Sequence, residues 1–380
     1  MKHILILGAG FGGLTSANEF LKHKVDANIT VIDKKQEYCM GLTNLWVMIG
    51  KGTPDKYRHK FDLLNKNGIN FINDEIKKID SENKIVTTLK KQFNYDYLIV
   101  ALGADLEPES TPGFNESAFN LYEMDGAYAI HNEIKKFRSG KIILLICKPP
   151  YKCPAAPYET LFLLDDYFTK RELRDNVILE ICTPEPQPMP TAGKKVGDEI
   201  IKILDEKNIK YNFNHKVMDI DPENKKIIFE NGIMEYDLLI GIPSHASPKV
   251  LKDSGLTDES GWISVDKKTL KAKFESVYAI GDNAAIKLAN GNNLPKAGVF
   301  AEEQAKIVVQ NIINEINSKK EKSEFEGKGG CFVELSTKTG TMVEGNFFAE
   351  PTPIVEIKQP SAEYSKGKEN FEKERIKEWF

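Results

Sequence analysis

Short runs of apolar residues, separated by polar turns and by segments with helical spacing, run along most of the chain. Apolar runs of about 4–8 residues bounded by turn residues are typical of strands that are buried on both faces of a parallel sheet. Apolar residues with a period near 3.6 are typical of helices that cover such a sheet. The pattern predicts strands at residues 4–7, 29–32, 97–101, 141–146, 177–181, 238–242 and 276–280, and helices at residues 14–21, 158–168 and 301–316.

The strand–helix–strand order occurs twice, once at the N-terminus and again from residue 141. This repetition predicts an α/β protein with two Rossmann-like domains. Residues 105–120 are rich in Pro, Glu and Gly, and we expect them to cross between the domains. We expect three units: a first domain at residues 1–110 and 236–316, a second at 111–235, and a small C-terminal α+β region at 317–380.

Composition narrows the class of protein. The chain has 380 residues with 52 Lys+Arg and 56 Asp+Glu, a formal net charge of −4, which argues against a nucleic-acid binder. It has no run of roughly 20 uncharged apolar residues and no visible secretory signal. We therefore expect a cytoplasmic protein without a transmembrane helix, peripheral contact with the cytoplasmic membrane being a second option. Its five cysteines are too few for a disulfide scaffold, so a disulfide would more plausibly be catalytic.

A glycine loop follows the first predicted strand. Gly8, Gly10 and Gly13 have the spacing G-x-G-x-x-G, and Asp33 ends the next strand. In such a loop the first glycine makes a tight turn, the second lets the backbone approach a pyrophosphate, and the third allows close helix–strand packing. The acid can accept hydrogen bonds from a ribose, and the helix N-terminus offers N–H groups to phosphate. The complete unit predicts a bound dinucleotide.

The second strand–helix–strand unit lacks such a loop. Its first strand is followed by residues 147–154, Cys-Lys-Pro-Pro-Tyr-Lys-Cys-Pro. Prolines lack the N–H groups that would bind a pyrophosphate, and the bulky side chains would block its approach. We therefore expect one dinucleotide, in the first domain, and different chemistry in the second.

Four motifs identify a family. They are GAGFGG (8–13), VYAIGD (277–282), KCPAAPYE (152–159) and GGCFVE (329–334), which contains Cys331. Together they resemble the glutathione-reductase-like flavoproteins, and among them sulfide:quinone oxidoreductase and the flavoprotein subunit of flavocytochrome c sulfide dehydrogenase. The glycine motif is generic, whereas KCPAAPYE combined with a distant cysteine is specific. The resemblance extends over nearly the whole chain.

The resemblance implies an FAD-dependent sulfide dehydrogenase with a redox-active disulfide, here Cys153–Cys331, beside the flavin. Glu159 matches a family carboxylate and is the acid–base candidate. Many relatives have a third catalytic cysteine that this chain lacks at the domain crossing, and Cys147 is the candidate substitute. Cys153 is expected to begin a helix. The residues expected to bind FAD are Gly8, Gly10, Phe11, Gly13, Asp33, Lys34, Cys39, Ala101, Gly103, Gly281, Asp282, Lys296 and Ala297.

The electron acceptor stays open between a membrane quinone and a cytochrome c partner. The flavocytochrome type carries FAD joined covalently to a cysteine near the position of Cys39, so covalent attachment is one option. Rival functions are a type II NADH:quinone oxidoreductase, a non-catalytic flavin-binding partner subunit, and a persulfide carrier that uses Cys153. A homo-oligomer is a further option.

Several residues have an ordinary structural interpretation beside a functional one. Cys182 ends a predicted buried strand and is expected to be a core thiol, while His245 follows a strand end near the expected flavin. No cysteine or histidine spacing is typical of a metal site, so none is predicted. The aromatic end of the chain, residues 371–380, could rest on a membrane or pack on the protein itself. Phe332, Phe347, Phe348 and Ile354 could line a quinone slot or fill a β core.

Overall fold

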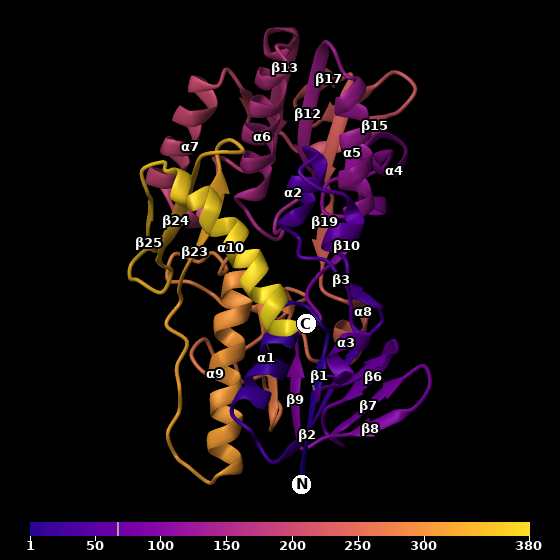
Figure 1. Cartoon of the computed structure of the whole chain (residues 1–380), viewed down its shortest axis with the longest axis vertical. Coiled ribbons are helices and arrows are strands. Elements are labelled where there is room, and N and C mark those ends of the chain that lie inside the picture. Colours follow the sequence, from indigo (N-terminus) through magenta and orange to yellow (C-terminus); the bar gives the residue numbers. More distant parts are fainter. Residues whose placement is uncertain (67) are drawn as a thin grey trace.

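The computed structural model, which describes residues 1–66 and 68–380, contains a parallel five-stranded sheet built mostly from the N-terminal part of the chain (Figure 1). β1 lies in its centre and pairs with β2 and β9. A strand from much later in the sequence, β21, pairs with β9 and forms one edge. The strands, in sheet order, are β21 (Val277–Ala279), β9 (Tyr97–Val100), β1 (Lys2–Leu7), β2 (Ala27–Asp33) and β5 (Asn70–Asn73).

Both faces of this sheet are covered, which explains why its strands are continuously apolar. Ile4 and Ile6 of β1 face α1 (Phe11–Lys22) and α9 (Gly298–Ile316), whereas Leu5 and Leu7 face the other side. This alternation follows from the two-residue period of a strand. The other side is covered by α8 (Lys249–Asp253) and by an antiparallel sheet of β6 (Ile76–Asp80), β7 (Ile85–Thr88) and β8 (Gln92–Asn94).

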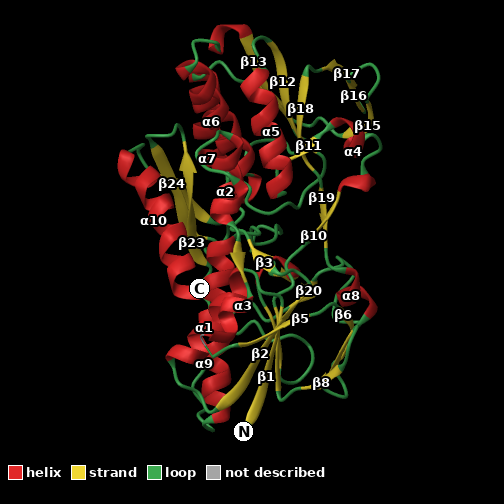
Figure 2. Ribbon diagram, turned by 45° about the vertical axis from the view of Figure 1, so that its right-hand side comes forward, coloured by secondary structure: helices red, strands yellow, loops and turns green. Residues whose placement is uncertain are grey.

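A second parallel five-stranded sheet forms the other half of the molecule. Its strands are β11 (Phe119–Asn120), β18 (Leu238–Ile242), β12 (Gly140–Ile146), β13 (Val177–Cys182) and β14 (Lys210–Asn212), in sheet order. Figure 2 shows helices on one side of this sheet and a small antiparallel sheet on the other. The helices are α5 (Met124–Lys136), α6 (Ala156–Lys170) and α7 (Lys194–Glu206), and the small sheet contains β15 (Val217–Asp221), β16 (Lys226–Phe229) and β17 (Gly232–Glu235).

The predicted α/β class with two Rossmann-like sheets is therefore confirmed, but one strand lies in a different sheet from the one expected. β18 pairs with β12 and β11 in the second sheet, whereas the boundary drawn at residue 236 placed it in the first domain. The apolar run predicted the strand correctly. It could not predict the sheet, because a strand buried on both faces has the same pattern in either one.

A two-stranded antiparallel ladder joins the two halves. β10 (Asp105–Glu107) follows the carboxyl end of β9, and β19 (Ser244–Ala246) follows the carboxyl end of β18. The carboxyl ends of both parallel sheets therefore point toward this junction, which is where open α/β sheets bind ligands. The expected crossing at residues 105–120 also contains α4 (Phe114–Ser117).

The C-terminal region is an antiparallel sheet followed by a long helix. The sheet contains β23 (Lys328–Glu334), β24 (Gly340–Asn346) and β25 (Ile354–Ile357). The helix, α10 (Ala362–Trp379), runs from this sheet to α1 and packs against β23, β24 and α1 (Figure 1). The C-terminal region therefore contacts both halves of the molecule.

The aromatic end of the chain packs on the protein itself. The ring of Trp379 lies 5.2 Å from the Phe11 ring, and the Phe371 ring stacks on Phe11 at 6.1 Å. Phe380 stacks on Tyr38 at 6.2 Å. No helix in the described parts of the chain is long and apolar enough to cross a membrane.

Candidate quinone-lining residues in the C-terminal region differ in burial. Phe347 is buried in the core and Phe348 packs against Phe325, whereas Ile354 is exposed. Phe332 is half-buried and meets Phe371 of α10 edge to face. Phe347 and Phe348 thus fill a β core. Ile354 and Phe332 lie outside it.

Short elements complete the chain, and the longer helices match their predictions. The helix predicted at 14–21 is α1, the one at 158–168 is α6, and the one at 301–316 is α9. The remaining elements are α2 (Thr43–Met48), α3 (Asp62–Lys66), β3 (Glu37–Tyr38), β4 (His59–Lys60), β20 (Ile263–Ser264), β22 (Ala284–Ala285), and 3-10 turns at Pro54–Tyr57, Pro108–Ser110, Arg174–Asn176, Pro190–Ala192 and Gly281–Asn283.

Candidate active site

The glycine loop between β1 and α1 has the geometry that its spacing predicts. Gly8 has φ +97°, and a Cβ there would lie 2.3 Å from the carbonyl oxygen of Ala101. A Cβ at Gly13 would lie 1.9 Å from the carbonyl oxygen of Gly8. Neither position tolerates a side chain. At Gly10, by contrast, a Cβ would meet no atom within 4 Å, so the backbone there borders open space. The loop therefore leaves room for a phosphate at the N-terminus of α1.

Asp33 lies at the carboxyl end of β2, directly beside this loop. Its carboxylate accepts hydrogen bonds from the backbone N–H groups of Ala9, at 2.7 Å, and of Lys35, at 2.8 Å. The next side chain, Lys34, places its Nζ 3.8 Å from an Asp105 oxygen. Each Asp33 oxygen keeps a free lone pair for a ribose hydroxyl. The glycine loop and Asp33 therefore fit the ADP half of FAD.

Phe11, also expected at this site, has two different surroundings. Its backbone lies at the first position of α1, beside the phosphate space, while its ring packs against Trp379 and Phe371 of α10. The residue therefore connects the glycine loop to the C-terminal helix.

A second turn closes the carboxyl end of the first sheet. Gly281 has φ +71° and donates its N–H to the Gln304 side chain of α9 at 2.8 Å. The Asn283 amide accepts from Gly103 N–H at 3.2 Å and donates to the carbonyl of Val100. These bonds hold Ala101, Gly103, Gly281 and Asp282 at the same edge. Asn283 and Gln304 were not predicted, because nothing in the sequence separates a turn-fixing amide from any other polar residue.

Lys296 lies against this turn. Its Nζ donates to the carbonyl oxygen of Asp282 and lies 3.4 Å from the centre of the Trp262 ring. Burial lowers the pKa of Lys296 to about 8, and the nearby Asp282 carboxylate opposes this shift. Ala297 follows as the residue that precedes α9. A half-buried ammonium group at the carboxyl edge of the sheet fits the stabilisation of an anionic flavin.

Cys153 is held next to Lys296 by backbone pairing. Lys152 and Lys296 form a parallel bridge, and Cys153 donates its N–H to the Lys296 carbonyl at 2.6 Å. Cys153 has φ +53°, the left-handed region, which is costly for a residue other than glycine. α6 begins only at Ala156, so Cys153 does not begin a helix as expected. It precedes the helix by one turn, and the Ala156 N–H bonds back to the Cys153 carbonyl at 3.0 Å.

The strand that holds the second predicted cysteine packs against α6, the helix that follows Cys153. Cys331 lies in β23, far along the sequence, and both thiols are free in this structure. Burial raises the pKa of Cys153 to about 11; Glu159 raises it further and Lys368 opposes both. Burial also raises the pKa of Cys331, and the charge of a Cys153 thiolate is the second cause. The contact of β23 with α6 and the effect of one thiol on the other place both cysteines in the same part of the molecule.

Glu159 belongs to a buried charge cluster beside this pair. Glu159, Glu334 and Lys368 are each at most 3% exposed. The Lys368 ammonium donates to Glu159 and, at 3.0 Å, to Glu334, and Trp46 Nε1 donates to Glu334 at 2.8 Å. Burial raises the pKa of Glu159 to about 7; Lys368 opposes the shift and the Glu334 charge adds to it. Burial thus favours the protonated form of this carboxyl group more than it would for an exposed glutamate.

Lys368 was not predicted as a site residue. It lies in a helix whose sequence alternates Lys and Glu, a pattern typical of a solvent-exposed helix. The face of this helix that is buried in the structure could have singled out Lys368. The same face contains Ser365 and Glu372, which are also buried, so it is too polar to be recognised as a buried face from the sequence.

In the loop that replaces the second glycine motif, a tyrosine side chain is buried and bonds to a carboxylate. Tyr151 is 3% exposed and donates its hydroxyl to Glu185 at 2.7 Å, and Thr183 bonds to the same carboxylate. Burial raises the pKa of Glu185, and the hydrogen bonds from Tyr151 and Thr183 oppose the shift. Glu185 follows the carboxyl end of β13, the position at which a nucleotide-binding unit presents its ribose-binding acid. Here that acid bonds to the protein's own tyrosine.

Cys147 is not brought to the cysteine pair. It lies in a separate hydrophobic cluster that also contains Ile143, Leu145 and Cys182, on the face of the second sheet covered by β15–β17. The two-residue period of β12 explains this side, because residues 143, 145 and 147 point the same way. Burial raises the pKa of Cys147 to about 12 and that of Cys182 to about 12. Cys182 is a core thiol, as its position predicted, and Cys147 has the same surroundings.

Cys39 lies in the loop after β3 and is half-buried. Burial raises the pKa of its thiol; the Glu37 carboxylate adds to the shift, and the Arg58 guanidinium lowers it. Its neighbour Tyr38 packs against Trp379 and Phe380 of the C-terminal helix.

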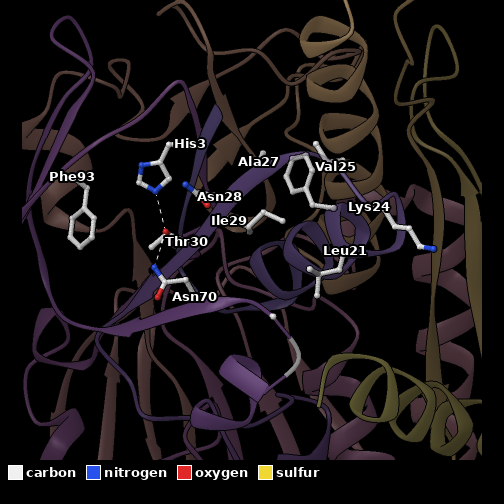
Figure 3. A pocket seen from close by; sticks show the side chains of 12 residues that line it. His3, Leu21, Lys24, Val25, Ala27, Asn28, Ile29, Thr30, Asn70 and Phe93 are labelled. Atoms are coloured by element: carbon white, nitrogen blue, oxygen red, sulfur yellow. Dashed lines mark hydrogen bonds between the residues drawn. The ribbon is translucent and has the colours of Figure 1, made fainter. Parts of the chain in front are cut away.

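A cavity of about 560 Å³ lies elsewhere, at the amino ends of β1, β2 and β5 (Figure 3). The glycine loop is at the opposite edge of the same sheet. His3 Nε2 lies 3.0 Å from the Thr30 hydroxyl, and Asn70 donates to the same hydroxyl at 3.1 Å. These polar groups bond to each other, and we do not count the cavity as part of the candidate site.

Comparisons with known proteins agree with this geometry. The family model described as pyridine nucleotide-disulphide oxidoreductase matches residues 2–145 and 169–305. A mitochondrial sulfide:quinone oxidoreductase of Dictyostelium discoideum is 27% identical and is matched over 95% of this chain and 81% of its own length. A sulfide-quinone reductase of Aquifex aeolicus is 24% identical over 92% of this chain and 84% of its own length.

The fold agrees with a solved structure as well. The sulfide:quinone oxidoreductase of Aquifex aeolicus superposes with a TM-score of 0.90 at 21% identity, covering 100% of this chain and 91% of that chain. The similarity includes both parallel sheets and the C-terminal region, because the whole of this chain is covered.

Proposed function

The chain belongs to the pyridine nucleotide-disulphide oxidoreductase family, and we propose that within it the protein is an FAD-dependent sulfide dehydrogenase. It oxidises sulfide to zero-valent sulfur or polysulfide through Cys153 and Cys331, and it passes the electrons through FAD to a quinone. The observation that supports this most is the place of Cys153: its N–H donates to the Lys296 carbonyl at 2.6 Å, and the Lys296 ammonium donates to the Asp282 carbonyl at the expected flavin edge. The names of the relatives in Dictyostelium discoideum and Aquifex aeolicus support sulfide and quinone as the substrates.

The sulfur chemistry balances with two cysteines. Hydrosulfide attacks one sulfur of the Cys153–Cys331 disulfide, so a new S–S bond forms to that cysteine and the other leaves as a thiolate. A second hydrosulfide attacks the outer sulfur of the persulfide. The products are a disulfide anion, HSS⁻, a proton and two cysteine thiolates that hold the two electrons. FAD, when bound, supplies the two-electron acceptor that restores the disulfide.

The charge cluster contains the group that accepts the proton released in this reaction. Oxidising two hydrosulfide ions to HSS⁻ releases one proton inside a buried site, where free charge is costly. Glu159, with a pKa of about 7, can accept it, and Lys368 holds the carboxylate in place through its bond to Glu159. Glu334 fixes the geometry, because its N–H donates to the same Glu159 oxygen at 2.8 Å.

Reduction by NAD(P)H is disfavoured by the second domain. Tyr151 and Glu185 bond to each other where a nucleotide would need an open glycine loop and a free acid. Covalent attachment of FAD through Cys39 stays a prediction from the sequence. Cytochrome c as the acceptor, a homo-oligomer and membrane contact stay predictions as well.

The test is anaerobic reduction of the flavin by sulfide in Cys153→Ser. We expect the variant to retain its yellow FAD and to lose reduction by sulfide by at least about 10³-fold, the usual scale for loss of a covalent nucleophile. Cys182→Ser is the matched control, because Cys182 is a core thiol that keeps a bond from Asn212. Reduction of Cys153→Ser at the wild-type rate would refute the disulfide mechanism. Reoxidation of the reduced wild type by a short-chain quinone supports the acceptor, and reoxidation by cytochrome c alone would replace it.

A further inference from the structure

The imidazole of His245 carries one nitrogen without a partner. His245 lies in β19, at the junction of the two halves, and its Nδ1 lies 2.9 Å from the carbonyl oxygen of Pro243. A carbonyl can only accept, so Nδ1 carries the hydrogen and donates it. In this tautomer Nε2 has no hydrogen and is a hydrogen-bond acceptor.

Nε2 is buried. His245 is 8% exposed, and its Nε2 has no hydrogen-bond partner among residues 1–66 and 68–380. A buried acceptor without a donor carries the full cost of its lost hydration, so such groups usually await a ligand or a water. Nε2 can therefore accept a hydrogen bond from a small molecule that carries a donor.

Protonation of the ring cannot satisfy this nitrogen. Burial lowers the pKa of His245 to about 3, and the positive charges of Lys152 and Lys296 lower it further. The Pro243 carbonyl opposes the shift without reversing it. His245 is thus a neutral acceptor beside two cationic side chains.

Tyr122 connects His245 to the loop that carries the reactive cysteine. The ring of Tyr122 meets the imidazole edge to face, with centroids 5.4 Å apart. The Tyr122 hydroxyl donates to the Lys152 carbonyl at 2.7 Å and lies 3.4 Å from the Cys153 carbonyl. Tyr122 follows β11, His245 follows β18 and Cys153 follows β12, so all three lie at the carboxyl edge of the second sheet. At this edge the chain has the proline-containing loop of residues 147–154 in place of a glycine loop.

The chemistry of this corner fits hydrosulfide. The ion is negatively charged, which suits the lysines, and it carries one S–H hydrogen, which suits a neutral acceptor. We propose that His245 positions the sulfide substrate: its Nε2 accepts the S–H hydrogen of the hydrosulfide that attacks the cysteine pair. The proposal rests on the proposed function, since it names the binding group for that function's substrate. His245 is a positioning residue and exchanges no electrons.

The test compares His245→Phe with His245→Gln by rapid-mixing measurement of flavin reduction under anaerobic conditions. Phenylalanine removes the acceptor and keeps the ring, whereas the glutamine side-chain oxygen can reach the place of Nε2. We expect His245→Phe to raise the sulfide concentration for half-maximal rate by about tenfold, the scale of one lost hydrogen bond, with the limiting rate within about twofold. His245→Gln should recover most of the loss.

Two controls separate the outcomes. Dithionite reduction and FAD content should match the wild type in both variants, which shows that they fold. In ¹⁵N-histidine spectra, addition of sulfide to the wild type should shift a non-protonated ring nitrogen that His245→Phe lacks. Equal half-maximal concentrations in all three proteins would refute the positioning role and leave the proposed function intact. Failure of sulfide to reduce the wild type at any concentration would refute the proposed function itself.

Discussion

At the scale of single residues, burial dominates the ionisation of the groups that would carry the chemistry. The pKa values of Cys153 and Cys331 are raised, and Glu159 has a pKa of about 7 because it is buried next to a second carboxylate. Burial therefore disfavours the thiolates that the attack of sulfide produces. Glu159, whose pKa is about 7, belongs to the charge cluster beside them. In the proposed mechanism Glu159 is therefore the group that exchanges the proton.

Glu159→Gln tests that assignment through its pH dependence. Only the carboxylate form can accept a proton, so the limiting rate of flavin reduction by sulfide should rise through about pH 7 in the wild type. The variant should be slower by about 10²-fold, and this rise should be absent. Ionisation of sulfide itself affects both proteins equally, so the ratio of the two profiles is the quantity to compare. Glu185→Gln is the control, since that buried carboxyl bonds to Tyr151 instead. A constant ratio from pH 6 to pH 8 would exclude Glu159 as the base.

At the scale of elements, α10 connects the two halves of the molecule through polar contacts. Ser361 caps its N-terminus by accepting from Glu363 N–H at 2.9 Å, and Arg375 pairs with Glu302 of α9 at 3.1 Å. Lys368, between them, reaches the buried carboxylates of α6 and β23. Ion pairs therefore fix this helix together with the aromatic contacts of its C-terminal end.

Lys368→Met should loosen this helix in a pH-dependent way. The change leaves Glu159 buried without its cation, whereas Glu334 keeps the Lys51 ammonium at 3.7 Å, and breaking a buried pair costs about 3–5 kcal/mol. Without the Lys368 ammonium, the Glu159 carboxyl binds its proton more tightly in the folded than in the unfolded protein, so stability falls as pH rises. Urea unfolding should therefore show a larger loss at pH 8 than at pH 6. Lys366→Met, an exposed lysine of the same helix, should show neither effect. Equal stability of the two variants at pH 8 would contradict the anchoring role.

The same elements show how far sequence reasoning reached. Strands such as residues 4–7 and 141–146 were predictable, because their apolar runs are set by burial on both faces. The glycine loop was predictable because its spacing follows from backbone geometry. The partners of Lys368 were not, since they lie on two other elements and the helix pattern resembles a solvated one. For His245 the sequence showed only that it follows a strand end. The bond of its Nδ1 to Pro243 and the contact of its ring with Tyr122, which leave Nε2 without a partner, are visible only in the structure.

At the scale of the whole molecule, two Rossmann-like sheets meet with their carboxyl ends at one junction, and only one retains a nucleotide loop. The first sheet keeps the open space at Gly10 and the free lone pairs of Asp33. The second has replaced both features with Tyr151 and the buried Glu185. Cys153 lies on this same loop. Under the proposed function, one loop thus both lacks a nucleotide site and supplies the sulfur nucleophile.

The division between the sheets predicts which reductant acts on the intact protein. In an anaerobic titration followed by flavin absorbance, sulfide should bleach the yellow protein, and NADH or NADPH should leave it oxidised. A pyrophosphate needs several free backbone N–H groups, and the prolines of residues 147–154 cannot provide them. Dithionite gives the total of reducible flavin in the same sample. Bleaching by NADH at a rate comparable with sulfide would mean that the loop around Tyr151 opens to admit a nucleotide. The protein would then be a pyridine-nucleotide reductase whose cysteine pair accepts electrons from the flavin rather than donating them.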